Sequence, residues 1–169
     1  IESDQVDANL TNFPVLYSVT DTDLIDNVMS GSNYTIKFTN ATGTDLPYEV
    51  EYYNNTTGQL IAWVKADSLS STTDTAIHLY YGSSDTASTE NATGVWDSNY
   101  AGVWHMGDSG PTTVADSTGT NNGSAVGDPT FGSTGQINSA ILFNADHIDS
   151  GTDSSLDVTE LTWALWIKR

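Results

Sequence analysis

The chain has 169 residues, enough for one large or two small domains, and its formal net charge is −18, because 22 aspartates and glutamates outweigh four lysines and arginines. So few cations argue against nucleic acids and anionic membranes as partners, since both are bound through basic side chains. The chain has no cysteine, which excludes disulfides, and no apolar run long enough to insert into a membrane.

Short alternating segments predict β-strands in the first half of the chain. The first is NFPVLYSV, at residues 12–19, and two others follow at residues 58–66 and 75–82. In residues 46–53, apolar side chains take one face and glutamates take the other. Clusters of Asn, Thr, Gly, Ser and Asp separate these segments and are typical of turns. Short strands at this spacing predict an all-β, antiparallel β-sandwich or jelly roll.

The composition changes in the second half. Residues 108–135 are rich in Gly, Ser, Thr, Asn and Asp. The strand pattern then returns in three segments, at residues 137–144, 147–151 and 161–168. We therefore predict two modules, at residues 1–99 and 100–169. The last segment is apolar enough for a central strand, so we expect the second module to be incomplete or its sheet to be completed from elsewhere.

Five ordered motifs resemble the domain of unknown function 2341, a family of multidomain surface and secreted proteins of bacteria and archaea. They are NFPVLYSV, YTIKFTNATGTDLPYEVEYYN, IAWVKADSLS, IHLYYGS and VWDSNYAGVWHM, and they end near residue 106. The family's aromatic-basic opening strand is absent before IESDQV. The resemblance implies a β-sandwich in a surface or secreted protein and implies no established chemistry.

The remaining sequence is similar to the first part of a laminin-G-like, or concanavalin A-like, jelly roll. The motifs that carry this resemblance are GVWHM, ADSTGTNNG, GQINSAILFN and LTWALWIK. Such domains often follow the family named above in one chain. The resemblance implies extracellular recognition, often of glycans.

Sequons for N-glycosylation predict an extracellular or cell-surface location. Seven N-x-[ST] triplets occur, more than the composition would give by chance. They begin at Asn9, Asn33, Asn40, Asn54, Asn55, Asn91 and Asn122. Because the chain begins in mid-pattern at IESDQV, we expect a leader to have been removed or left out.

Three residues are predicted to contact a carbohydrate ligand. Trp96 lies in turn-like sequence and is expected to be the best exposed aromatic, with Asn99 beside it. Tyr53 is placed on the polar face of its strand. Aromatic rings pack on the apolar faces of sugar rings, although core packing is the alternative for each aromatic residue. We expect core positions for Trp63, Trp104 and one of the pair Trp163 and Trp166.

Calcium is the predicted cofactor, because clustered carboxylate and amide oxygens are its preferred ligands. Three patches supply them: Asp21, Asp23 and Asp26; Asp108, Asp116, Asn121 and Asn122; and Asp149, Asp153 and Asp157. None has the spacing of an EF-hand loop. The alternative is that these side chains cap turns by bonding their own backbone. A saline habitat would also explain the acidity.

Catalysis is not expected. Glu49 and Glu51 alternate onto one strand face about 7 Å apart, a separation that suits glycoside hydrolysis, but a solvated strand face explains them more simply. The three histidines lack zinc-site spacing, and no G-x-S-x-G motif occurs.

Two functions therefore compete. One is an extracellular recognition or adhesion module that binds glycans. The other is a structural subunit of a filament, sheath or surface layer, in which copies of the chain share β-strands. A glycan-cleaving enzyme ranks third.

Overall fold

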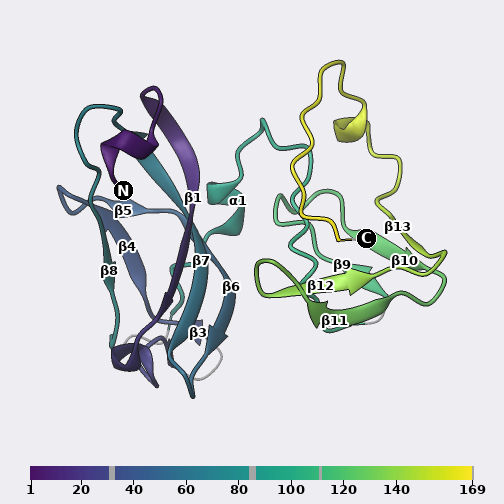
Figure 1. Ribbon diagram of the computed structural model, residues 1–169, viewed down its shortest axis with the longest axis horizontal. Coiled ribbons are helices and arrows are strands. Elements are labelled where there is room, and N and C mark those ends of the chain that lie inside the picture. The colour runs from purple at the N-terminus through teal and green to yellow at the C-terminus, as the bar shows by residue number, and fades with distance from the viewer. Residues whose placement is uncertain (31–32, 84–86, 111, 169) are drawn as a thin grey trace. The chain divides into compact units, whose positions relative to one another are not determined.

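The computed structural model describes residues 1–30, 33–83, 87–110 and 112–168. Its strands pair antiparallel, and the one α-helix in these ranges is α1, at Ala92–Val95. The prediction of an all-β, antiparallel fold is confirmed. The chain forms two compact units, Ile1–Trp96 and Asp97–Arg169 (Figure 1). No helix among the described residues is long and apolar enough to cross a membrane.

The first unit is a sandwich of two three-stranded sheets (Figure 1). One sheet contains, in spatial order, β1 (Leu10–Thr20), β7 (Gln59–Leu69) and β6 (Tyr48–Asn54). The other contains β5 (Asp45–Leu46), β4 (Lys37–Asn40) and β8 (Ile77–Tyr80). A short pair, β2 (Met29–Ser30) and β3 (Asn33–Tyr34), lies outside both sheets.

Aromatic rings join the inner faces of the two sheets. The ring of Phe38 in β4 lies 5.4 Å from that of Tyr17 in β1 and 5.4 Å from that of Tyr48 in β6, centroid to centroid. The buried core around them consists of Leu24, Val28, Ile36, Phe38, Leu46, Tyr48, Leu60, Ala62 and Val64. Each large apolar side chain buried in this way contributes about 1.5–3 kcal/mol to the free energy of folding. The two sheets therefore stay packed because alternation places these side chains on their inner faces.

A β-bulge in β6 changes which tyrosine enters the core. Val50 pairs with Ala62, but the next paired residue, Tyr52, faces Ile61 on the neighbouring position of β7. The extra residue reverses the alternation beyond the bulge. Tyr53 therefore packs against the core, and its hydroxyl donates a 2.6 Å hydrogen bond to the carbonyl of Leu24. The placement of Tyr53 on the polar face was wrong.

The second unit has two smaller antiparallel sheets. One contains β13 (His147–Asp149), β10 (Gly123–Val126) and β9 (Thr113–Val114), and the other contains β11 (Thr130–Thr134) and β12 (Ser139–Leu142). A 3₁₀ helix follows at Ser154–Leu156.

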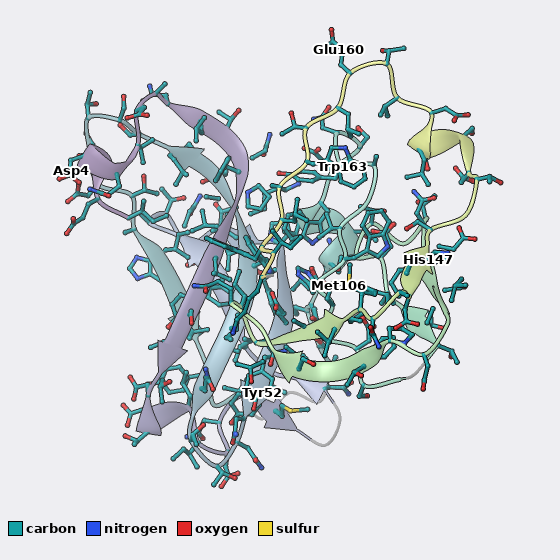
Figure 2. The ribbon with its side chains drawn as sticks, turned by 45° about the vertical axis from the view of Figure 1, so that its right-hand side comes forward. Asp4, Tyr52, Met106, His147, Glu160 and Trp163 are labelled. Atoms are coloured by element: carbon teal, nitrogen blue, oxygen red, sulfur yellow. The ribbon has the colours of Figure 1, made fainter. Side chains whose placement is uncertain are left out.

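The segment at residues 161–168 does not form the predicted strand. A strand needs a partner for its backbone groups, and no described segment pairs with this one. Trp163, labelled in Figure 2, and Trp166 are each 75% exposed. The prediction that one of them is a core residue was therefore wrong. Arg169 lies outside the described residues.

Candidate functional site

The outer face of sheet β5–β4–β8 carries the first candidate site. Strand alternation turns Phe38 and Leu79 toward the core and leaves Lys37, His78 and Tyr80 exposed on the other face. The register places Lys37 opposite Tyr80. We call this group, together with Asp45 of β5, the sheet-face site: Lys37, Asp45, His78 and Tyr80.

Contacts between these side chains give the sheet-face site its shape. The Lys37 ammonium lies 5.4 Å from the centroid of the Tyr80 ring and donates a 3.2 Å hydrogen bond to Asp45 Oδ1. Tyr80 is 52% exposed. An exposed ion pair of this kind contributes about 0–1 kcal/mol to stability. A ligand can therefore bond the ammonium or the carboxylate at little cost to the fold. An aromatic ring beside a donor and an acceptor on a flat sheet can stack on a sugar and bond its hydroxyls.

A second cluster lies on the outer face of sheet β1–β7–β6. Trp63 Nε1 donates a 2.8 Å hydrogen bond to Glu51 Oε2, and Trp96 Nε1 donates a 2.6 Å bond to Glu49 Oε2. The two indole rings lie 5.3 Å apart, tilted by 60°. We call these four residues the indole–carboxylate cluster. The two glutamates are half-buried and engaged, so the prediction of a solvated strand face was wrong.

Trp96 is not the exposed aromatic that the sequence predicted. It is only 7% exposed. Asn91 caps α1 by accepting a 2.9 Å hydrogen bond from Gly94 N, and the Trp96 backbone N–H closes the same short helix on Ala92. Helix α1 packs on β6 and β7 and so delivers Trp96 onto Trp63. The helix has four residues, too few to leave an amphipathic pattern.

Glu90 closes the outer edge of β6. Its Oε1 accepts a 2.7 Å hydrogen bond from the backbone N–H of Val50, and Asn91 N donates to the Tyr48 carbonyl. Burial raises the pKa of Glu90 and the charge of Glu49 adds to this rise, while the bond from Val50 opposes it. The edge of this strand is thus occupied from within the same chain.

Asp116 holds a loop in the second unit. It is 4% exposed, and its carboxylate accepts hydrogen bonds from the backbone of Val103, Thr118 and Asn121 and from the Thr118 hydroxyl. Burial alone would raise the pKa of Asp116, but these hydrogen bonds outweigh it and lower the pKa. Four donors fill the acceptor positions of a carboxylate, so the geometry gives Asp116 the role of a loop support.

The two asparagines that follow Asp116 are also engaged in hydrogen bonds of the second unit. Asn122 Oδ1 accepts from Asp116 N at 2.9 Å, and Asn121 Nδ2 donates to the Ala101 carbonyl and the Ser155 hydroxyl. The buried Oδ1 of Asn121 has no hydrogen-bond partner among the described residues.

The other acidic residues proposed for calcium act mainly as local caps. Asp21, Asp149 and Asp153 each accept a hydrogen bond from the backbone N–H two residues further on. Asp108 accepts from Ala115 N at 3.0 Å. Asp23, Asp26 and Asp157 complete no cluster of metal ligands among the described residues. Within the described ranges, no three His, Asp or Glu side chains form a group that could hold a metal ion. Calcium stays a prediction.

Trp96 and Tyr53, two of the predicted ligand contacts, are not brought together within the first unit. Trp96 and Tyr53 pack in the first unit, on opposite faces of its sheet β1–β7–β6. Asn99 is exposed in the second unit, where its backbone N–H bonds Asp97. Sequence reasoning missed Tyr80 and Lys37 as site residues. Their meeting depends on the β4–β8 register, which the sequence does not reveal.

Comparison with known proteins gives one family. The domain of unknown function DUF2341 matches residues 32–166, so the match runs through both units and beyond residue 106, where the sequence motifs ended. No curated protein and no solved structure matches the chain significantly. Because the match covers well over half of the chain, the protein belongs to the DUF2341 family.

Proposed function

We propose that the chain is an extracellular, non-catalytic recognition module that binds carbohydrate at the sheet-face site. The observation that carries this proposal is the exposed Tyr80 ring, with the Lys37 ammonium over one face of the ring and Asp45 paired with that ammonium. A sugar ring stacks its apolar face on the side of the Tyr80 ring that the ammonium leaves open, and hydroxyls at the edge of the sugar bond the ammonium and the carboxylate. The cost of forming the site is small because the strands already hold these groups.

The negative charge of the chain disfavours acidic polysaccharides as ligands. A net charge of −18 repels uronic acids and sulfated sugars. Lys37 is the cation of the sheet-face site, and Asp45 already neutralises it. We therefore propose a neutral polysaccharide as the ligand.

Binding of neutral polysaccharides to the purified chain, measured by calorimetry or on a glycan array, tests the proposal. We expect Tyr80→Ala to weaken binding at least about tenfold, which corresponds to about 1.4 kcal/mol. Tyr81→Ala, which removes the neighbouring exposed tyrosine, should leave binding unchanged. Equal binding by wild type and Tyr80→Ala, or no binding to any neutral polysaccharide, would overturn the assignment.

The indole–carboxylate cluster supports a non-catalytic role. A glycosidase needs one carboxyl group that protonates the leaving oxygen and one that attacks or activates water. Here one oxygen of Glu49 and one of Glu51 each accept an indole N–H. Incubation with the bound polysaccharide should release no reducing ends, and release that Glu49→Gln abolishes would make the chain an enzyme.

We also propose that the second unit is the N-terminal part of a laminin-G-like jelly roll that calcium stabilises. Its short antiparallel strands and the motifs GVWHM and ADSTGTNNG support the first part, and the high negative charge supports the second. Thermal unfolding with calcium and with a chelator tests the role of the metal. We expect a higher midpoint of unfolding in calcium than with the chelator, and equal midpoints would remove calcium from the proposal.

A structural subunit is the second candidate function, and one observation favours it. Five large apolar side chains of the segment at residues 161–168 are 54–80% exposed: Leu161, Trp163, Leu165, Trp166 and Ile167. An extended apolar segment of this kind can add as a strand to another copy of the chain. Light scattering after size-exclusion chromatography should then show polymers that Trp163→Ser with Trp166→Ser disperses. A monomer at all concentrations would exclude this function.

A further inference from the structure

The seven sequons differ in what their side chains already bond. Transfer of a glycan uses the Nδ2 of the asparagine, and the transferase reads the hydroxyl of the Ser or Thr two residues later. A sequon is therefore the better acceptor where both side chains are exposed and neither is engaged in a hydrogen bond of the folded chain. The hydrogen bonds of the folded chain separate the seven by this criterion.

Three sequons use the asparagine as a turn or helix cap. Asn40 Oδ1 accepts from the backbone and hydroxyl of Thr42, which is the hydroxyl residue of its own sequon, and its Nδ2 donates to Asp67 Oδ2 at 2.7 Å. Asn54 Oδ1 accepts from Thr56 N and Thr57 N, and its Nδ2 donates to the Tyr52 hydroxyl.

Asn91 is the third cap. Its Oδ1 accepts from Gly94 N at the start of α1 and from the hydroxyl of Thr93, the hydroxyl residue of this sequon. In a fourth sequon, which begins at Asn33, the hydroxyl residue is hidden: Thr35 is 7% exposed and its hydroxyl bonds the Val28 carbonyl.

The sequons at Asn9 and Asn122 run into strands. Asn9 Oδ1 accepts from the backbone and hydroxyl of Ser71, and its sequon continues into β1. Asn122 Oδ1 accepts from Asp116 N, and its sequon ends at Ser124, which pairs on both sides within sheet β13–β10–β9. Strand pairing holds both segments away from the open conformation that a transferase must grip.

The sequon at Asn55 is different because it lies at the tip of the β6–β7 hairpin. Gly58 N bonds the Asn54 carbonyl, and Gly58 has a φ of +68°, so the hairpin closes through the backbone and the Asn54 side chain. Asn55 and Thr57 are both exposed, as are the side chains of the sequons at Asn9, Asn91 and Asn122, so the difference lies in the hydrogen bonds. Neither side chain makes a hydrogen bond to any residue that the structure describes.

We propose that Asn55 is the N-glycan acceptor of this chain. The donor is a sugar attached to a polyprenyl phosphate or pyrophosphate, held by a transferase. Asn55 Nδ2 forms a bond to the anomeric carbon of the sugar, the bond from that carbon to the phosphate oxygen breaks, and the lipid phosphate leaves with the electron pair. The nitrogen loses one proton to a carboxylate of the transferase.

This inference rests on the proposed extracellular location, since such donors are used in secretion. It is independent of carbohydrate binding at the sheet-face site. Binding by the unglycosylated chain, made in a host without N-glycosylation, tests the proposed function separately from the acceptor.

Secretion of the full 169-residue chain from an N-glycosylating host, followed by glycopeptide mass spectrometry, tests the acceptor. We expect higher occupancy at Asn55 than at any other sequon, loss of that glycan in Asn55→Gln and Thr57→Ala, and retention in Thr57→Ser. Thr42→Ala, which removes only the sequon at Asn40, is the matched control and should change nothing. A glycan at Asn40 or Asn54 with Asn55 bare, or no glycan on any sequon, would overturn the proposal.

Discussion

The indole of Trp96 is anchored to Glu49 of strand β6 by a 2.6 Å hydrogen bond, across 47 residues of sequence. This bond ties the end of the first unit to its sheet β1–β7–β6. The ring of Trp63 lies against that of Trp96, and Glu51 accepts the Trp63 indole N–H. In the sequence, tryptophans suggest sugar contact and paired glutamates suggest glycoside hydrolysis. In the fold, these tryptophans and glutamates form hydrogen bonds with each other.

Trp96→Phe should destabilise the first unit. The substitution keeps an aromatic ring but leaves the half-buried Glu49 carboxylate without its indole donor, which costs about 1–3 kcal/mol. Trp96→Ala should cost about 3–5 kcal/mol, the usual range for a buried tryptophan. Urea unfolding of each variant measures both effects.

Trp166→Phe is the matched control, because this indole is 75% exposed. It should change stability by less than about 0.5 kcal/mol. Equal losses for Trp96→Phe and Trp166→Phe would contradict the burial of Trp96.

Tyr53→Phe should cost about 1 kcal/mol, since it removes the hydrogen bond from the hydroxyl to the Leu24 carbonyl. The comparison with Tyr52, labelled in Figure 2, tests the bulge directly. Tyr53→Ala should destabilise the chain several times more than Tyr52→Ala, because Tyr53 and not Tyr52 packs on the core. A larger loss of stability in Tyr52→Ala than in Tyr53→Ala would mean that β6 alternates without a bulge and that Tyr52 faces the core.

Strand β6 shows which features of the fold the sequence alone predicts and which it does not. Alternation in residues 46–53 correctly predicts a strand with Tyr48 and Val50 on the core face. It fails at Tyr53 because a bulge depends on the pairing with β7, and nothing within LPYEVEYY signals it. The position of Trp96 fails for a related reason, since a tertiary contact decides its burial. Tyr80 and Lys37 meet only once β4 and β8 are paired.

Asp116→Ala should locally unfold the backbone around Val103 and around residues 118–121. Its carboxylate satisfies three backbone N–H groups, those of Val103, Thr118 and Asn121. A buried donor left unsatisfied costs about 1–3 kcal/mol. The Asn121 N–H is buried and the other two are part-buried, so we expect the free energy of unfolding of this region to fall by about 3 kcal/mol. Hydrogen exchange of peptides that cover these segments measures the effect.

Asp108→Ala is the control, because Asp108 accepts one hydrogen bond from the described residues, that of Ala115 N. It should lower the free energy of unfolding by about 1 kcal/mol.

Acid should loosen the same backbone segments that the Asp116 substitution loosens. The lowered pKa of Asp116 means that its stabilisation is present above the unfolded aspartate pKa of about 3.9 and is lost as pH falls through the folded value. Exchange in Asp116→Ala should not respond to acid in this way.

Glu90→Gln should stabilise the first unit at neutral pH. Burial and the nearby Glu49 charge raise the pKa of Glu90, so the fold favours the protonated form. Stability from this group is therefore full below the unfolded glutamate pKa of about 4.3 and is lost as pH rises through the folded value. A glutamine removes the charge and keeps an oxygen for the Val50 N–H.

Urea unfolding measures the effect. The midpoint of Glu90→Gln should lie above that of wild type at neutral pH and converge with it in acid. Glu2→Gln, which changes an exposed glutamate, is the control and should have the wild-type midpoint at every pH. A lower midpoint for Glu90→Gln at neutral pH would mean that the ionised carboxylate itself holds the edge of β6.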